Sequence, residues 1–389
     1  MEINLSKYSS IFWNLFLLGL FGFTIYFLIR YGQYGVDIKL HNLYLEEYLD
    51  RGFFPIPPGY YFLIYLLDLL FRIKYPFVLS SLLVLTFFIW WKYRIMLAWL
   101  SDGQKQKINS NHLLALALVF IGPIVLPAVD REFWYFGKFS PTVWHNSTLI
   151  AVLPFSLILF SKTILWWENR AQRFPWAILG LGLLILAIKP SFLFCFVPLF
   201  PLFSALYFSP KGKPFAYSCL VSFFLLAGIG FEKILVYNWD PIILEDYSEE
   251  ELPKIAIQPF KVWLHYAFEP FWDFFSSFSL SILFLLLWGK KAFQNKKFTF
   301  SFFLLLLALL IYFLFAETGF RQWHANFFWQ IPITLLIHQA LMLSFVIEQK
   351  ESNQRQASWK TRLFFLLFSL NLICGIAYWL RIFTDRIIS

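Results

Sequence analysis

Long apolar runs recur along most of the chain, and they limit what the chain can fold into more than any other feature does. A helix rises 1.5 Å per residue, so roughly 20 apolar residues cross the hydrocarbon core of a bilayer. Of the 389 residues, 59% are hydrophobic and only 14% are charged, which lies outside the composition of soluble domains. The sequence therefore predicts an all-α protein, a polytopic bundle of transmembrane helices forming one domain over residues 1–389.

The individual runs predict the number of spans and the position of the N-terminus. The first run extends from Ile11 to about Leu28, and no small-residue cleavage site follows it, so we expect an uncleaved signal anchor with a cytoplasmic N-terminus. The run from Gly59 to Phe71 is too short to cross and predicts a juxtamembrane or re-entrant helix. About eleven spans are expected: 11–28, 77–91, 113–129, 149–161, 175–188, 190–208, 215–236, 278–288, 300–316, 333–347 and 363–383.

The charged residues predict which loops face which side. Most of the 32 Lys and Arg lie at Lys7 or in one set of alternate loops, which the positive-inside rule assigns to the cytoplasm: 92–112, 162–174, 207–214, 289–299 and 348–362. The opposite loops hold most of the remaining acids and four histidines: 31–76, 130–148, 237–277 and 317–332, with a short turn at Lys189. We therefore expect any chemistry on the non-cytoplasmic face. Because no retrieval signal or appended luminal domain is visible, we expect a multi-pass integral protein of a bacterial plasma (inner) membrane.

Several classes of function are disfavoured by the same features. The net charge of +9 resides in short loops between spans, so nucleic acid is not an expected partner. The three cysteines lie inside apolar runs, which argues against disulfides and thiolate zinc sites. The sequence has no Walker A loop, GxGxxG fingerprint, HExxH motif or nucleophile elbow, and the short basic loops leave no room for a nucleotide site. An activated donor would then have to come from the membrane, and a lipid-linked phosphate is its natural form.

Four short motifs on the expected external face carry a resemblance to a known group. They are VDIKLHN with FPIPPGYYFLIYLL, then SPTVWHNST, AIKPSFL and GFRQWHANFFW. With their alternating spans, they resemble the GT-C superfamily of polyprenyl-phosphate-dependent glycosyltransferases. Members often carry an Asp-Glu pair in the first external loop, whereas here Asp37 is followed by isoleucine. This departure leaves the branch of the superfamily and the use of a metal open.

The resemblance implies transfer of a sugar with inversion, and Asp37 is the candidate general base. Such a reaction needs a carboxylate to take the proton of the acceptor hydroxyl, and partial burial would raise its pKa toward that role. The alternative is a solvated acid that caps a helix starting near Leu40. His41, four residues further on, would lie on the same helical face as Asp37 and could orient it. A plain interfacial histidine is the other interpretation.

The second external loop contributes four candidate substrate-binding residues. Asp130 and Arg131 end one span, and His145 and Asn146 begin the next. They could shape a sugar pocket or add a carboxylate to a site for a divalent metal, which is possible but not required. Alternatively, the Asp and Arg pair with each other, and Ser147 or Thr148 caps the following helix.

Cations and a histidine in two other segments are candidates for binding phosphate. Lys189 lies between two apolar runs and could hold a phosphate, or could simply extend to the interface. Arg321 and His324 would share a face of a helix, and Asn326 adds an amide, so that the three could bind the phosphate leaving group. In the same segment, Trp323 and Trp329 belong by default to the interfacial belt.

The expected function is therefore transfer of a sugar from a polyprenyl-phosphate donor to a lipid, glycan or protein acceptor, with membrane lipids as surroundings. An amphipathic helix in the second half of loop 237–277 would partly cover the site. A transporter or flippase of lipid-linked saccharide is an alternative, and it predicts ionisable residues within the spans and internal repeats. An O-antigen polymerase or ligase is another, although loop 237–277 lacks the expected arginines.

Overall fold

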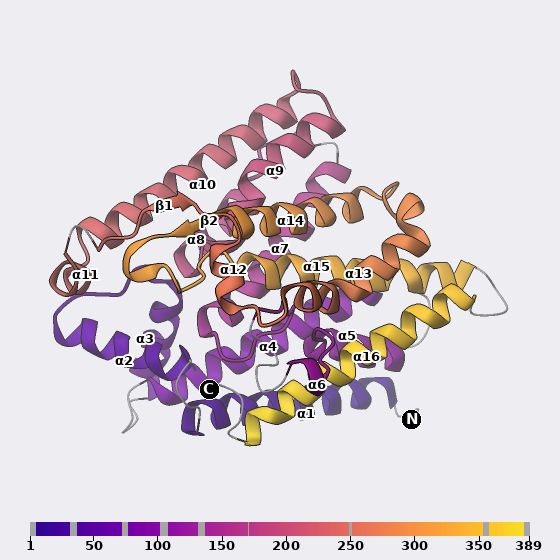
Figure 1. The fold of residues 1–389 in the computed structure, drawn as a ribbon, viewed down its shortest axis with the longest axis horizontal. Helices are drawn as coiled ribbons and strands as arrows, with labels where there is room; N and C mark the ends of the chain where they lie inside the picture. Colours follow the sequence, from indigo (N-terminus) through magenta and orange to yellow (C-terminus); the bar gives the residue numbers. More distant parts are fainter. Residues whose placement is uncertain are drawn as a thin grey trace.

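Eight helices are long and apolar enough to cross a membrane in the computed structural model, which describes residues 5–31, 37–71, 77–101, 108–130, 137–169, 171–248, 251–352 and 358–384. They are α1 (Leu5–Tyr31), α4 (Val78–Ser101), α7 (Ser147–Glu168), α10 (Lys213–Asn238), α13 (Pro270–Ala292), α14 (Lys296–Leu314), α15 (Gln330–Ser352) and α16 (Trp359–Arg381). Figure 1 shows them packed side by side along the long axis. The expectation of an all-α, multi-pass membrane protein is confirmed at this level.

Four apolar helices are shorter than a bilayer requires. Three of them occupy positions where we expected full spans: α5 (Ile108–Phe120), α8 (Trp176–Ile188) and α9 (Ser191–Tyr207). The fourth, α3 (Gly59–Phe71), has the bounds of the expected juxtamembrane helix. Helices α8 and α9 are separated by Lys189 and Pro190, because a proline has no N–H to donate and favours a helix start. By length and composition, the described residues contain eight helices that could cross a membrane, against the eleven or so spans that we expected.

Helix α4 is longer than the sequence pattern indicated. We expected a span at 77–91 and a loop from Lys92, but the helix continues to Ser101. The side chain of Lys92 is only 6% exposed, and its Nζ lies 5.9 Å from the centre of the Trp144 ring. A lysine can remain in a helix at this depth because its apolar stem packs and its ammonium meets an aromatic face.

The loop at 237–277 differs from our expectation in a similar way. Its apolar second half does not form a single amphipathic helix, because it is divided between α12 (Lys261–Tyr266) and the first turns of α13. Pro270 occupies the first position of α13, where its fixed φ angle and missing N–H are tolerated. The expected span at 278–288 therefore begins eight residues earlier, at Pro270.

Helix α15 is the central helix of the bundle. In its most apolar window 89% of the residues are buried, against 22% in α10. It contacts α4, α5, α7, α9, α13 and α14. A helix that is apolar all round is expected to be surrounded by protein or lipid, and here the neighbouring helices supply most of the cover.

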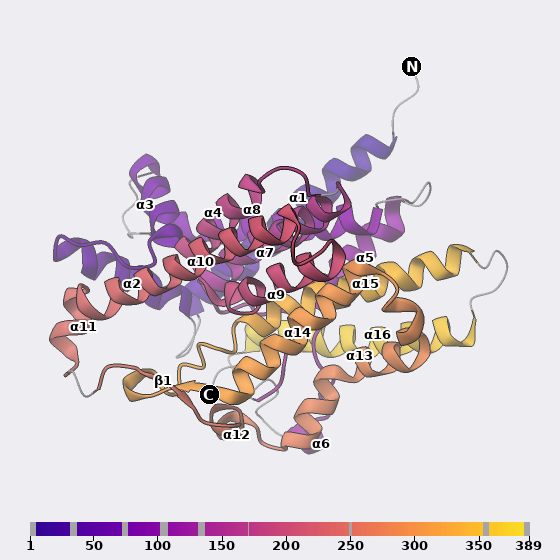
Figure 2. The ribbon, with the colours of Figure 1, turned by 90° about the horizontal axis from the view of Figure 1, so that it is seen from above.

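Short elements connect the long helices, and several of them lie at one end of the bundle. They are α2 (Asp37–Asp50), α6 (Pro127–Asp130), α11 (Pro241–Asp246), β1 (Ile255–Ile257), β2 (Phe315–Glu317) and the 3₁₀ turns η1 (Gly319–Arg321) and η2 (Ile382–Thr384). Strands β1 and β2 pair antiparallel with Ala256 opposite Ala316. Figures 1 and 2 both show α2, α3 and α11 together at this end, where α1 ends and α10 ends.

Candidate functional site

Asp37 is the first residue of α2 and sits half-buried at the helix N-terminus. The helix thus starts three residues earlier than Leu40, and an acidic residue in its first turn is favoured by the helix dipole. Its Oδ2 accepts a hydrogen bond of 2.5 Å from Asn146 Nδ2. Burial raises the pKa of the Asp37 carboxyl, and the nearby His145, Lys189 and His324 partly oppose that shift.

Asn146 connects this carboxylate to two other elements. Its side-chain Oδ1 accepts from the backbone N–H of Leu149 at 2.9 Å, so Asn146 caps α7, one residue before the cap position that we predicted. The same oxygen accepts from Thr148 Oγ1 at 3.2 Å and from Lys189 Nζ at 3.3 Å. Because the residue is only 2% exposed and all its amide groups are used, its orientation is fixed.

Lys189 points from the break between α8 and α9 toward Asn146. Its Nζ donates to Thr148 Oγ1 at 3.0 Å and lies 4.9 Å from the centre of the Trp329 ring. Burial lowers its pKa to about 8, while the negative charge of Asp37 acts in the opposite direction. Within the described residues, Lys189 forms no ion pair with a carboxylate, so its charge is free to meet an anion.

Two histidines flank the same group. The buried Nδ1 of His145 has no hydrogen-bond partner among the described residues, and its ring meets the Trp329 ring with centres 6.3 Å apart. Burial lowers the pKa of His145. Burial also lowers the pKa of His324, with Arg321 adding to the shift and Glu317 and Asp37 opposing it. Neutral imidazoles can donate or accept a proton, and a buried ring nitrogen without a partner has an unmet hydrogen bond that a ligand or water could satisfy.

The segment that follows β2 is a tight turn rather than the α-helix in which Arg321 and His324 would share a face. It forms η1, and the N–H of His324 donates to the carbonyl of Arg321 at 3.0 Å. The guanidinium carbon of Arg321 lies 5.2 Å from the centre of the Tyr237 ring on α10. Arg321 has no ion pair with a carboxylate in the described chain.

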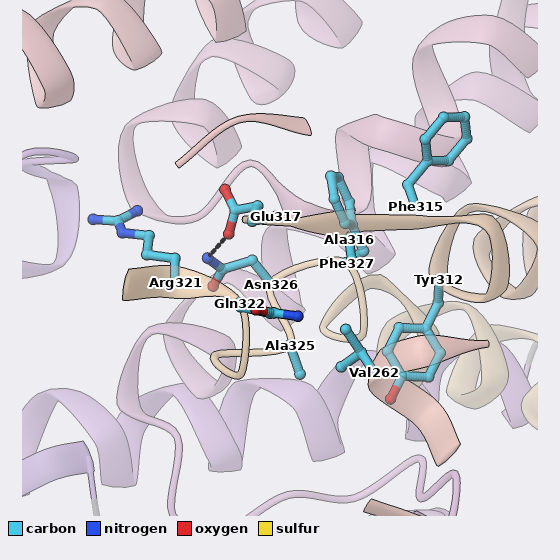
Figure 3. A pocket seen from close by; sticks show the side chains of 10 residues that line it. All are labelled: Val262, Tyr312, Phe315, Ala316, Glu317, Arg321, Gln322, Ala325, Asn326 and Phe327. Carbon is cyan, nitrogen blue, oxygen red and sulfur yellow. Dashed lines mark hydrogen bonds between the residues drawn. The ribbon is translucent and has the colours of Figure 1, made fainter. Parts of the chain in front are cut away.

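Asn326 lies in a small pocket beside this turn. Its Nδ2 donates to Glu317 Oε2 at 2.5 Å, as Figure 3 shows, so this amide hydrogen is already satisfied. The guanidinium of Arg321 points away from Asn326 and from Val262 on the opposite wall. Asn326 therefore supports the shape of the turn more directly than it offers a donor to a ligand.

His41 does not contact Asp37. Its Nδ1 and the hydroxyl of Tyr61 are 2.5 Å apart, and its ring also meets Tyr60 with centres 5.9 Å apart. Burial is the main reason that its pKa falls to about 3, so the ring is neutral at ordinary pH. His41 thus fixes α2 on α3, and the prediction that it orients Asp37 is not matched by the geometry.

Asp130 lies in a separate buried ion cluster. Its Oδ1 is 2.8 Å from Lys138 Nζ, which also lies 3.2 Å from Asp273 Oδ1. Trp272 Nε1 and the backbone N–H of Leu126 also donate to the Asp130 carboxylate, at 3.1 and 2.6 Å. Arg131 lies outside the described residues. Asp130 therefore ties α6 to α13 and is not one of the groups that surround Asp37.

The sequence analysis did not single out Glu232, Tyr61 or Tyr237. Glu232 lies within the spanning helix α10 and is electrostatically coupled to Arg321. The Glu232-Lys233 pair inside an apolar run was the signal that could have found it, because acids in spans are costly and tend to be functional. No comparable signal identified the two tyrosines, since the chain has 19 tyrosines.

The described residues contain no group of three or more His, Cys, Asp or Glu side chains arranged to hold a metal ion. The four residues that do come together are Asp37, Asn146, Lys189 and His145, with Arg321 and His324 on the adjoining turn. This arrangement combines one carboxylate of raised pKa with two cations, Lys189 and Arg321, that form no direct ion pair within the described residues. Comparison with protein-family models and with curated proteins found no match to this chain.

Proposed function

We propose that the protein is an inverting glycosyltransferase of the GT-C type. It moves a sugar from a polyprenyl-phosphate donor to a lipid, glycan or protein acceptor on the non-cytoplasmic face of a bacterial plasma membrane. The observation that carries the proposal is the meeting of Asp37 with the unpaired cation Lys189 through a single amide, Asn146. A base for the acceptor and a charge for the leaving group are the two groups that this reaction requires.

The residues would divide the reaction between them. Asp37 takes the proton of the acceptor hydroxyl, and the acceptor oxygen bonds to the anomeric carbon as the bond from that carbon to the phosphate oxygen breaks. The leaving phosphate gains negative charge, which Lys189 and Arg321 stabilise. The charges of both Asp37 and Arg321 act on the pKa of His324. Its ring would therefore lie between the base and the phosphate ligand Arg321.

The test is transfer of radiolabelled sugar from synthetic polyprenyl-phosphate donors by the purified protein. Asp37→Asn keeps the size of the side chain but removes the base, so turnover should fall at least a hundredfold while donor binding remains. Asp50→Asn at the exposed end of the same helix is the matched control and should leave turnover unchanged. Full activity in Asp37→Asn would show that Asp37 is not the general base.

One set of observations favours the transporter alternative. Spanning helices contain buried polar and basic groups that we expected to be rare, namely Lys92 in α4 and His338 and Gln339 in α15, all 6% exposed or less. Ionisable groups at such depth often mark transport pathways. In proteoliposomes, movement of a fluorescent lipid-linked saccharide between leaflets without sugar transfer would favour a flippase over the enzyme.

A further inference from the structure

An apolar surface covers the segment from Lys254 to Phe271, which contains β1, α12 and the first two residues of α13. Its outward side chains are large and apolar, with Ile257 at 73% and Phe271 at 83% exposed; the others are Ile255, Phe260 and Leu264. We call this segment the surface strip. So much exposed apolar area in one short segment indicates that something covers it.

The strip has a buried and an exposed side in each of its elements. In β1, Ile255 and Ile257 point outward, whereas Ala256 pairs with Ala316, which is 1% exposed. In α12, Val262 and Trp263 pack inward and Leu264 is 53% exposed. The inner side therefore holds the strip on the bundle, and the outer side is left for a partner outside the chain.

The strip lies where spanning helices end. Strand β2, to which β1 pairs, follows directly after α14, and the strip runs into the start of α13. Phe275, one turn after Phe271 on α13, is also 55% exposed, so the apolar surface continues onto a spanning helix. Figure 2 shows β1, α12 and the beginning of α13 along one flank of the molecule. This continuity points to the bilayer as the covering partner.

Backbone chemistry limits how deep the strip can lie. Within the described residues, β1 pairs only with β2, so its other edge keeps unpaired N–H and C=O groups. Such groups cost several kcal/mol each in hydrocarbon and are tolerated only where water or headgroups reach them. The strip therefore belongs at the interface, with apolar side chains entering the acyl region.

The charges of the strip select among lipids. The strip carries two exposed lysines, Lys254 and Lys261, among its apolar side chains, and one exposed acid, Glu269, close to its end at the start of α13. Interfacial lysines are attracted to anionic headgroups by about 1 kcal/mol each. A zwitterionic surface would not offer this attraction.

We propose that the surface strip is an interfacial anchor for an anionic phospholipid surface, and that it is coupled to the turn that carries Arg321. The ring of His265 stacks on Trp323 with centres 3.9 Å apart, and the hydroxyl of Tyr266 donates to the carbonyl of Trp323. Val262 on the inner side of α12 lines the same small pocket as Arg321 and Asn326 (Figure 3). Lipid contact on the outer side of α12 thus helps to hold the turn that carries Arg321 in place.

The test places a spin label at Ile257→Cys or Leu264→Cys in the full chain, with the partly exposed Cys219 replaced by Ser, in nanodiscs. At both positions the spin label should collide more often with oxygen, which dissolves in lipid, than with a water-soluble nickel complex. Phe223→Cys on α10, where the native side chain is 63% exposed, is the control for lipid. Asp246→Cys, at the exposed C-terminal end of the short helix α11, is the control for water and should show the reverse. Collisions with nickel as frequent as at Asp246→Cys would show that the strip faces solvent and would overturn the proposal. Few collisions with either reagent would show that a protein covers the strip, which would also overturn it.

The charge requirement has its own test. A spin-labelled phosphatidylglycerol should associate with the protein more strongly than a spin-labelled phosphatidylcholine, measured as the motionally restricted fraction. Because 1 kcal/mol corresponds to about fivefold, replacing Lys254→Gln or Lys261→Gln should lower that preference by up to about fivefold. An unchanged preference in the double variant would overturn the role of the two lysines. Neither measurement depends on sugar transfer, so both stand apart from the proposed function.

Discussion

Asn146 donates a hydrogen bond of 2.5 Å to Asp37, although 109 residues separate them along the chain. The same side chain caps α7 through the N–H of Leu149 and accepts from Lys189. The Asn146 amide, at the start of α7, therefore sets the distance between the Asp37 carboxylate on α2 and the Lys189 ammonium after α8. Any change in Asn146 should move the candidate base relative to the candidate phosphate ligand.

Replacing Asn146 by Ala should reduce sugar transfer far more than it reduces stability. Loss of a helix cap typically costs about 1 kcal/mol. Asn295 offers a matched control, because it caps α14 in the same way through the N–H groups of Lys297 and Phe298 but lies away from Asp37. The unfolding temperature should fall in both variants, and further in Asn146→Ala because Asp37 and Lys189 then lose a buried partner, whereas only Asn146→Ala should lose transfer. Equal activities would argue against a role of Asn146 in positioning.

The pH dependence of transfer should be bell-shaped. Activity should rise as Asp37 ionises, at a pH above that of an ordinary aspartate, because burial raises its pKa. It should fall as pH rises through about 8, where Lys189 loses its charge. Lys189→Arg keeps the charge to much higher pH and should move the descending limb upward while leaving the ascending limb in place. An unmoved descending limb would assign it to another group.

His41 should make the protein less stable at acidic pH. Its pKa falls from 6.5 to about 3 on folding, so the unfolded chain binds the proton more tightly. Stability from this group is therefore complete above 6.5 and is lost as pH falls toward 3, with a slope of up to about 1.4 kcal/mol per pH unit. His41→Gln should flatten that part of the stability profile, measured by denaturant unfolding in detergent. A slope that persists in the variant would exclude His41 as its source.

Lys138→Met should strongly destabilise the protein, because it leaves Asp130 and Asp273 buried without a cation. Removing one partner of a buried ion pair typically costs about 3–5 kcal/mol. Arg51→Met breaks an exposed, solvent-screened pair with Glu47 and Glu245 and should cost far less stability. Similar unfolding temperatures for the two variants would contradict the structural role of the Asp130 cluster.

Gly375→Ala should separate α16 from the end of α5. A methyl group at this position would overlap the carbonyl of Phe120 and the N–H of Gly122, which are backbone atoms and cannot move aside easily. Gly180→Ala on α8 is the control, because nothing lies within 4 Å of its added methyl group. Alanine there should be neutral or stabilise by up to about 1 kcal/mol, owing to its higher helix propensity. Equal unfolding temperatures would argue against close packing at Gly375.

Features that depend on neighbours in the chain were predictable from the sequence. The apolar runs determined the helical membrane class, and the short run after the Pro-Pro pair predicted α3 with its observed bounds. Hydropathy is a local property, because each residue contributes its own transfer free energy whatever it later contacts. The same property could not fix where α4 ends, since Lys92 is retained in the helix by Trp144, which is distant in sequence.

The partners of the polar side chains were decided only by the tertiary structure. Asp130 meets Lys138, His41 meets Tyr61 and Asp37 meets Asn146 because packing brings these residues together. Nothing local predicts that β1 pairs with β2 or that Asn326 turns to Glu317. A hydrogen bond needs its two atoms within about 3 Å, and that closeness is a consequence of how the helices pack rather than of residue type. The sequence determined which chemical groups the chain carries, and the fold decided which of them meet.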